Sequence, residues 1–125
     1  RYSVPKPGAL LMAYPVMNFN EVKLLYHVLM DPGECGWRFY CSSVADVVTD
    51  DYPPVYFWYG KNDIILPLMD LQKQGPAFEK ALQAHGVPYQ MHVYKNAGHS
   101  IGTGRGTDAE GWLTEAAAFW EEQVG

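Results

Sequence analysis

The feature that most constrains the fold is a short, wholly apolar run in the middle of the chain. Val55 to Tyr59 is a run of β-branched and aromatic residues, with the pair Pro53-Pro54 before it and Gly60 after it. A run of this length between turn-forming residues is typical of a strand, and the lack of polar alternation indicates that both faces are buried. Because such strands occur in parallel sheets covered by helices on both sides, the run predicts an α/β fold.

Two further strands and three helices are predicted around this run. Apolar or β-favouring residues predict strands at 9–14 and 87–94, and apolar residues at helical spacing predict helices at 21–30, at 76–85 and from 107 to the end of the chain. The resulting order is β, helix, insertion, β, helix, β, helix. It predicts three parallel strands joined by right-handed crossovers and flanked by helices.

Two of the helices carry end signals. For the middle helix, Pro76 stands in the predicted first turn and Gly86 at the predicted left-handed C-terminal cap. For the last helix, Thr107 and Glu110 have the spacing of a capping box. Apolar residues then recur every four positions and predict the face that packs on the sheet: Trp112, Ala116, Trp120 and Val124. Leu113, Ala117 and Phe119 widen this stripe.

The region 20–48 is predicted to be a cap or insertion. Asn20 can cap the helix at 21–30, and Ser42 to Val48 is expected to form a helical turn or two. Between them lies an aromatic cluster, Trp37, Phe39 and Tyr40, which either lines a substrate pocket or fixes the insertion to the core.

Composition excludes several classes of function. The chain has 125 residues, and 48% of them are hydrophobic, which is enough to form a packed core. Its net charge of −5 gives no basic patch that could bind nucleic acid. No apolar run approaches the roughly 18 residues of a membrane span, so we expect a soluble and, by default, cytoplasmic protein. Cys35 and Cys41 lack neighbouring metal ligands, and either free thiols or a disulfide fits them.

A carboxylate and an imidazole follow two of the predicted strands. Asp63 comes just after the run at 55–59, and His99 lies in the glycine-rich loop after the strand at 87–94. Because the carboxyl ends of parallel strands meet at one edge of the sheet, the two side chains are expected to lie together there. The alternatives are an ordinary turn aspartate and a loop histidine with a backbone partner. The order, acid before histidine, is that of the last two members of an α/β-hydrolase triad.

A family resemblance rests on motifs along nearly the whole chain. They are Tyr14-Pro15-Val16, Gly60-Lys-Asn-Asp63 with Leu66-Pro67, Gly86-Val-Pro88, Tyr94 to His99, and Trp112. In this order they resemble the C-terminal portion of an α/β-hydrolase of the esterase/lipase type, of the acetyl-xylan-esterase-like or dienelactone-hydrolase-like kind. The resemblance implies a serine hydrolase acting on a small-molecule ester, with Asp63 as triad acid and His99 as general base, and no cofactor.

The sequence departs from that family at the nucleophile. No G-x-S-x-G elbow is present, and none of Ser3, Ser42, Ser43 and Ser100 has that context. We therefore expect residues 1–125 to be the C-terminal half of a single α/β-hydrolase domain with an incomplete sheet. The N-terminal half with the serine is expected upstream of Arg1, and the chain is expected to be inactive alone. The open edge of the first strand is expected to bind that half or to self-associate.

The remaining polar motifs favour structural roles. His27, His85 and His92 lack carboxylates at ligand spacing, so no metal site is predicted. Residues 102–106 are glycine-rich but lack the ending of a phosphate loop, and a linker is favoured. Two alternatives to an esterase stay open. They are a non-catalytic binding or interaction module on the same scaffold and a fragment of a prolyl-oligopeptidase-type peptidase.

Overall fold

The computed structural model describes residues 5–18, 43–63 and 71–125. Along the chain the elements are β1 (Leu10–Ala13), η2 (Val44–Val47), β2 (Val55–Gly60), α4 (Leu71–Ala84), β3 (Tyr89–Tyr94) and α5 (Trp112–Val124). The predicted helix at 21–30, the aromatic cluster and both cysteines lie outside the described residues. The predicted helical structure at 42–48 is a single 3₁₀ turn, η2.

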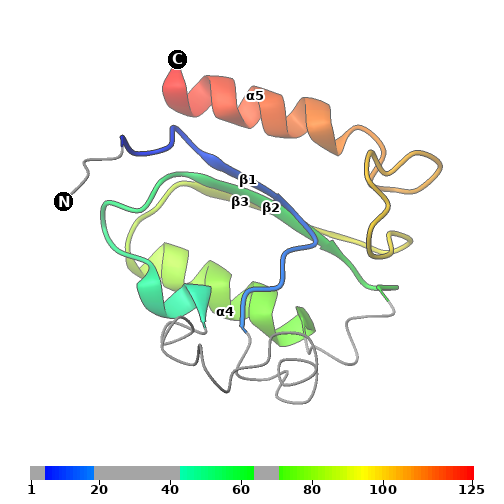
Figure 1. Cartoon of the computed structure of the whole chain (residues 1–125), viewed down its shortest axis with the longest axis horizontal. Helices are drawn as coiled ribbons and strands as arrows, with labels where there is room; N and C mark the ends of the chain where they lie inside the picture. The colour runs from blue at the N-terminus through cyan, green and yellow to red at the C-terminus, as the bar shows by residue number, and fades with distance from the viewer. Residues whose placement is uncertain (1–4, 19–42, 64–70) are drawn as a thin grey trace, which may run out of the picture.

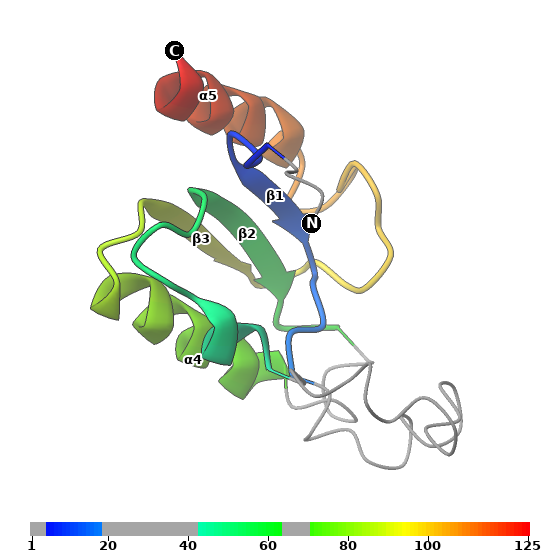
Figure 2. The ribbon, with the colours of Figure 1, turned by 60° about the vertical axis from the view of Figure 1, so that its left-hand side comes forward.

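The three strands form one parallel sheet in the order β1-β2-β3. β2 lies in the centre, with Val55 opposite Leu10 of β1 and Tyr89 of β3. Figures 1 and 2 show α5 on one face of the sheet and α4, with η2 beside it, on the other. The predicted arrangement, three parallel strands with flanking helices, is confirmed.

β2 separates two apolar cores. Its side chains alternate between the faces of the sheet, as strand geometry requires. Val55, Phe57 and Tyr59 pack with Phe78 and Leu82 of α4. On the other face Tyr56 and Trp58 pack with Ala116 and Phe119 of α5. Because both faces are covered, every residue of β2 is buried, as predicted.

The helix α4 begins earlier than predicted. It starts at Leu71, so Pro76 lies inside the helix rather than in its first turn, and the predicted start was wrong. Gly75 permits the close packing of this turn, because a Cβ there would lie 2.3 Å from the Tyr59 ring. The predicted end is confirmed: Gly86 has φ +63°, the left-handed conformation that a glycine adopts without strain.

The helix α5 begins later than predicted, at Trp112. Thr107 does not form the expected capping box, since its hydroxyl accepts the Ala109 N–H at 3.1 Å. Glu110 instead accepts the Gly106 N–H at 3.0 Å. Asp108 accepts the backbone N–H groups of Lys95 and Asn96, which fastens this loop to the end of β3. Asp108 and Glu110 thus bond to the loops before them, and the helix begins only at Trp112.

The apolar stripe of α5 is only partly used. Ala116 and Phe119 are buried, whereas Leu113, Trp120 and Val124 are 50%, 45% and 48% exposed. The prediction that the whole stripe packs on the sheet was therefore wrong. Trp120 and Val124 lie over Gly8, just before the edge strand β1, where no further described strand covers them. Among the described residues, no helix is long and apolar enough to cross a membrane.

Candidate active site

Asp63 is a buried carboxylate at the carboxyl end of β2. The strand ends at Gly60, and the turn that follows places Asp63 with 2% of its surface exposed. Its N–H points back to the Gly60 carbonyl at 3.4 Å. Burying a carboxylate costs free energy unless hydrogen-bond donors face it. The partners of Asp63 therefore indicate why it is buried.

His99 lies in the loop after β3, and that loop packs directly on the end of β2. A Cβ at Gly60 would lie 1.9 Å from the Ala97 carbonyl oxygen, so only a glycine permits this approach. On its other side the loop is held by Trp112, whose indole N–H donates to the Gly102 carbonyl at 2.8 Å. The histidine loop is thus held between β2 and the start of α5.

The two predicted triad residues meet in the structure. His99 Nδ1 lies 2.7 Å from Asp63 Oδ2. Since an ionised carboxylate only accepts hydrogen bonds, a neutral imidazole in this contact donates from Nδ1 and keeps the lone pair on Nε2. The Asp63 side chain is fully buried and that of His99 is 20% exposed. A buried acid thus orients a partly exposed imidazole, an arrangement that can take up and return a proton.

One aromatic ring, that of Tyr14 after β1, packs beside the imidazole. The Tyr14 ring lies 4.9 Å from the His99 ring and 5.1 Å from the ring of Trp58 between centroids. Sequence reasoning placed Tyr14 at the end of a strand but gave it no part in the site. Its position directly after the carboxyl end of a strand neighbouring β2 was the available signal.

The predicted substrate-binding residues Trp37, Phe39 and Tyr40 lie outside the described residues. Ser43 bridges to Asn18, and Ser100 adopts a left-handed backbone with φ +60° beside His99. Within the described part of the chain, no serine hydroxyl hydrogen-bonds to His99, and no three His, Cys, Asp or Glu side chains gather as metal ligands.

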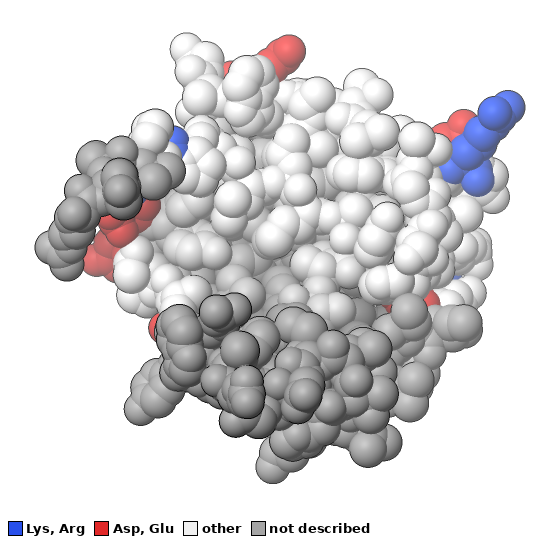
Figure 3. All heavy atoms as spheres, in the orientation of Figure 1, with Lys and Arg blue, Asp and Glu red and all other residues white. Residues whose placement is uncertain are grey.

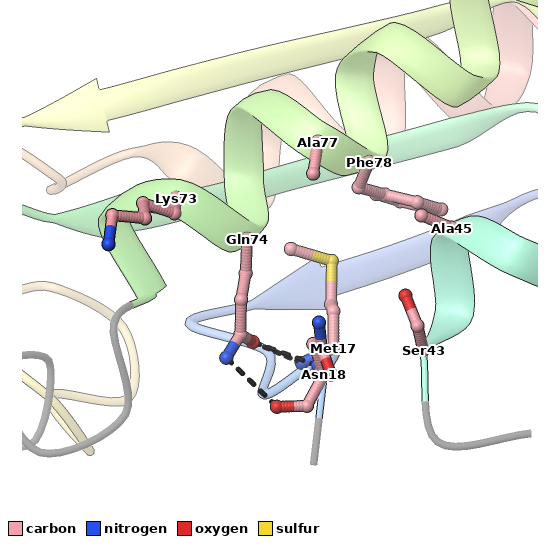
Figure 4. A pocket seen from close by; sticks show the side chains of 8 residues that line it. All are labelled: Met17, Asn18, Ser43, Ala45, Lys73, Gln74, Ala77 and Phe78. Atoms are coloured by element: carbon pink, nitrogen blue, oxygen red, sulfur yellow. Dashed lines mark hydrogen bonds between the residues drawn. The ribbon is translucent and has the colours of Figure 1, made fainter. Parts of the chain in front are cut away.

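A shallow hollow lies between β1's exit loop, η2 and α4 (Figure 4). Its empty volume is about 240 Å³, part of it open to solvent. Gln74 spans it, accepting the Met17 and Asn18 N–H groups at 2.9 Å and donating to the Asn18 carbonyl at 3.0 Å. Because the amide of Gln74 is used for these backbone bonds, this side chain joins α4 to the loop after β1.

The sequence is matched by one family model over most of its length. That model, the prolyl oligopeptidase family, matches residues 15–125. No curated protein sequence matches the chain.

Solved structures resemble the fold. An acetyl ester-xyloside bifunctional hydrolase from Caldicellulosiruptor lactoaceticus is 21% identical, with a TM-score of 0.74 over 93% of this chain and 42% of that one. A carboxylesterase from Lactobacillus plantarum is 18% identical, with a TM-score of 0.69 over 93% and 44%. A sugar hydrolase from Lactococcus lactis is 19% identical, with a TM-score of 0.71 over 94% and 49%. The chain therefore spans less than half of each of these proteins, and the predicted α/β-hydrolase fold is confirmed.

Proposed function

Because this chain belongs to the prolyl oligopeptidase family, we propose that it carries the acid and the base of a serine-hydrolase triad. Asp63 is the acid and His99 the base. The observation that supports this most directly is the 2.7 Å contact between His99 Nδ1 and Asp63 Oδ2 at the carboxyl edge of a parallel sheet. The acid precedes the histidine along the chain, as in the α/β-hydrolase order.

In the proposed reaction His99 works through the nitrogen that Asp63 leaves free. Nε2 takes the proton of a serine hydroxyl as that oxygen attacks the substrate carbonyl, and it then returns the proton to the leaving group. Asp63 holds the imidazole in the required tautomer and stabilises the imidazolium that forms in between. Its burial strengthens this interaction, because little water screens it.

The nucleophile and the oxyanion donors are proposed to lie upstream of residue 1. Residues 1–125 contain no G-x-S-x-G elbow, and in this fold one oxyanion amide belongs to the residue after the serine. The 125 residues alone are therefore proposed to be the C-terminal part of the domain and inactive. The segment that completes the domain is proposed to pair with β1, an edge of the described sheet.

An ester is the proposed substrate class. The similar structures include an acetyl ester hydrolase and a carboxylesterase. An ester also makes the smaller demand on His99, because a good alcohol leaving group departs with little protonation whereas an amine must be protonated.

The test is labelling by a fluorophosphonate probe, which reacts with activated serines. The protein is expressed together with the sequence that flanks residues 1–125 in its gene. We expect rapid labelling that is lost in His99→Ala. The matched control is His85→Ala, because His85 Nδ1 also contacts a carboxylate, Asp50 Oδ1, at 2.5 Å but on the surface. Equal labelling of the wild type and His99→Ala would refute the proposal.

Peptide-bond hydrolysis is the second candidate, and the family match favours it. The two activities separate on substrates that share the acyl-enzyme route but differ in the acyl and leaving groups. A p-nitrophenyl ester and a prolyl-peptide arylamide are compared with the same preparation. Hydrolysis of the arylamide at a rate comparable with that of the ester assigns a peptidase, and turnover of the ester alone assigns an esterase.

A further inference from the structure

We propose that Tyr14 is a positioning residue for His99, holding the imidazole in its hydrogen bond to Asp63. The catalytic consequence of this role rests on the proposed function, whereas the orientation of His99 does not. Tyr14 lies on the loop after β1, whereas Asp63 follows β2 and His99 follows β3.

The Tyr14 ring fills the space between His99 and the core. It lies 4.9 Å from the imidazole with the two planes at 52°, and 5.1 Å from the Trp58 ring in an edge-to-face arrangement at 83°. Trp58 is fully buried in β2 and is itself packed against the rings of Tyr94 and Trp112. His99 is therefore supported through Tyr14 by the fully buried central strand of the sheet.

The backbone of Tyr14 is held in a conformation that a tyrosine disfavours. Its N–H donates to the Trp58 carbonyl at 2.7 Å, which continues the ladder of β1 and β2 by one residue. Its φ is +41°, in the left-handed region where a Cβ is strained and a glycine is not. The Tyr14 backbone is therefore strained where it places the ring beside His99. Backbone strain of this kind concentrates at functional sites.

The ring supplies a restraint that the hydrogen bond alone lacks. The torsion that turns an imidazole about its Cβ–Cγ bond has broad energy wells, so one contact at Nδ1 leaves the ring free to tilt. An aromatic neighbour on the other side limits that tilt. This restraint acts on the step in which His99 takes a proton.

The experiment compares variants that keep or remove the ring. Tyr14→Phe keeps it, Tyr14→Leu removes it, and Tyr14→Gly removes it while relieving the backbone strain. Tyr89→Leu is the matched control, because Tyr89 opens β3 at the opposite end of the sheet. In each protein, expressed with its flanking sequence, we measure the downfield NMR signal of the proton between His99 and Asp63 and the kinetics of fluorophosphonate labelling.

The expected result separates the ring from the fold. Tyr14→Leu and Tyr14→Gly broaden or lose the NMR signal through exchange with water, and at saturating probe their labelling rate falls about tenfold with the half-saturating concentration unchanged. Tyr14→Phe and Tyr89→Leu keep the signal and label within about twofold of the wild type. If Tyr14→Leu fails to fold, Tyr14→Gly still tests the ring.

Two outcomes overturn the proposal. One is an unchanged NMR signal in a folded ringless variant, and the other is the same loss in Tyr14→Phe as in Tyr14→Leu. A wild type that no probe labels but whose NMR signal depends on the Tyr14 ring refutes the proposed hydrolase function and leaves the positioning role established.

Discussion

The carbonyl oxygen of Ala97 occupies the space in which residue 60 would carry a side chain: a Cβ at Gly60 would lie 1.9 Å from it. The last residue of β2 and the loop of His99 are therefore in direct backbone contact. This contact sets the height of the His99 loop above the sheet, and with it the distance from His99 to Asp63.

We expect Gly60→Ala to push the His99 loop away from β2. The added Cβ would clash with the Ala97 carbonyl, a backbone group that cannot move aside as a flexible side chain can. The substitution should therefore lower the free energy of unfolding by about 1–3 kcal/mol. It should also weaken the contact between Asp63 and His99. Urea unfolding and fluorophosphonate labelling measure the two effects.

Gly98→Ala is the control for that loop. A Cβ at Gly98 meets Ile101 only at 3.9 Å, an ordinary contact. This variant should therefore stay close to the wild type in both measurements. Equal losses in the two variants would show that the loop tolerates no added methyl group anywhere, and the specific role of Gly60 would be wrong.

The acid can be tested without changing its shape. Asp63→Asn keeps the volume of the buried side chain but removes the charge, and its amide can offer a donor where His99 needs an acceptor. We expect the fold to persist while fluorophosphonate labelling falls by about 10³- to 10⁴-fold, the range typical of a triad acid. Circular dichroism checks the fold. Asp50→Asn, at the exposed pair with His85, should leave the labelling rate unchanged.

The contribution of Gln74 to stability follows from its three hydrogen bonds to the loop after β1. Gln74→Leu leaves the buried Met17 N–H without that acceptor, and the expected loss is about 2–3 kcal/mol in the free energy of unfolding. Gln83→Leu is the matched control on the same helix, because Gln83 is exposed. Guanidinium unfolding curves give both values, and a loss below that of Gln83→Leu would contradict the assignment.

The sheet and the Asp63–His99 pair were predictable because both follow from short-range patterns and one geometric rule. The run at 55–59 predicts a strand that is buried on both faces. Parallel strands bring their carboxyl ends to the same edge of the sheet. The helix starts were not predictable in this way. Asp108 and Thr107 have the composition of a helix cap. Asp108, however, accepts the Lys95 N–H, and the Thr107 hydroxyl donates to the Gly104 carbonyl. The local sequence does not reveal these partners in the loops before them.

The role of Tyr14 was hidden for a similar reason. A tyrosine at a strand end carries no periodic signal, and its importance depends on the rings of His99 and Trp58, which come from distant parts of the sequence. The exposed side of α5 was missed because a stripe of apolar residues predicts burial without saying against what. Trp120 and Val124 reach the edge of the described sheet rather than its centre.

Alkaline pH should unfold the chain through its buried phenols. Burial raises the pKa of Tyr56 well above its usual value, and the neighbouring Tyr94 phenol and Glu115 carboxylate raise it further. Burial likewise raises the pKa of other tyrosines: Tyr52, Tyr59, Tyr89 and Tyr94. A pKa that is higher in the folded state makes a contribution that is complete below the unfolded value of about 10 and is lost as the pH rises beyond it.

The loss should therefore steepen above pH 10, by up to about 1.4 kcal/mol per pH unit for the fully buried Tyr56. Phenolate absorbance and circular dichroism, followed together, measure it. We expect most of the absorbance change to coincide with unfolding. Full ionisation of the tyrosines before any loss of secondary structure would contradict the burial of Tyr56.

The open side of β1 should make the isolated 125-residue chain self-associate. Leu11 is 43% exposed on this edge strand and points to the same face as Ala9 and Ala13, which pack with α5. Figure 3 views the molecule from the side of β1, and over the described residues charged side chains appear mainly at the periphery of this face. An unpaired strand edge beside apolar side chains is a template for another strand, and a lysine on the edge opposes such pairing.

We therefore expect the chain to sediment as concentration-dependent oligomers and Leu11→Lys to shift it toward the monomer. Val93→Lys is the matched control on β3, the other edge strand of the described sheet, where Val93 is 36% exposed. If association runs through β1, this second variant should leave the sedimentation profile close to that of the wild type. A monomeric wild type, or equal effects of the two lysines, would mean that β1 is not the associating edge, and the proposal that a completing segment pairs there would lose its support.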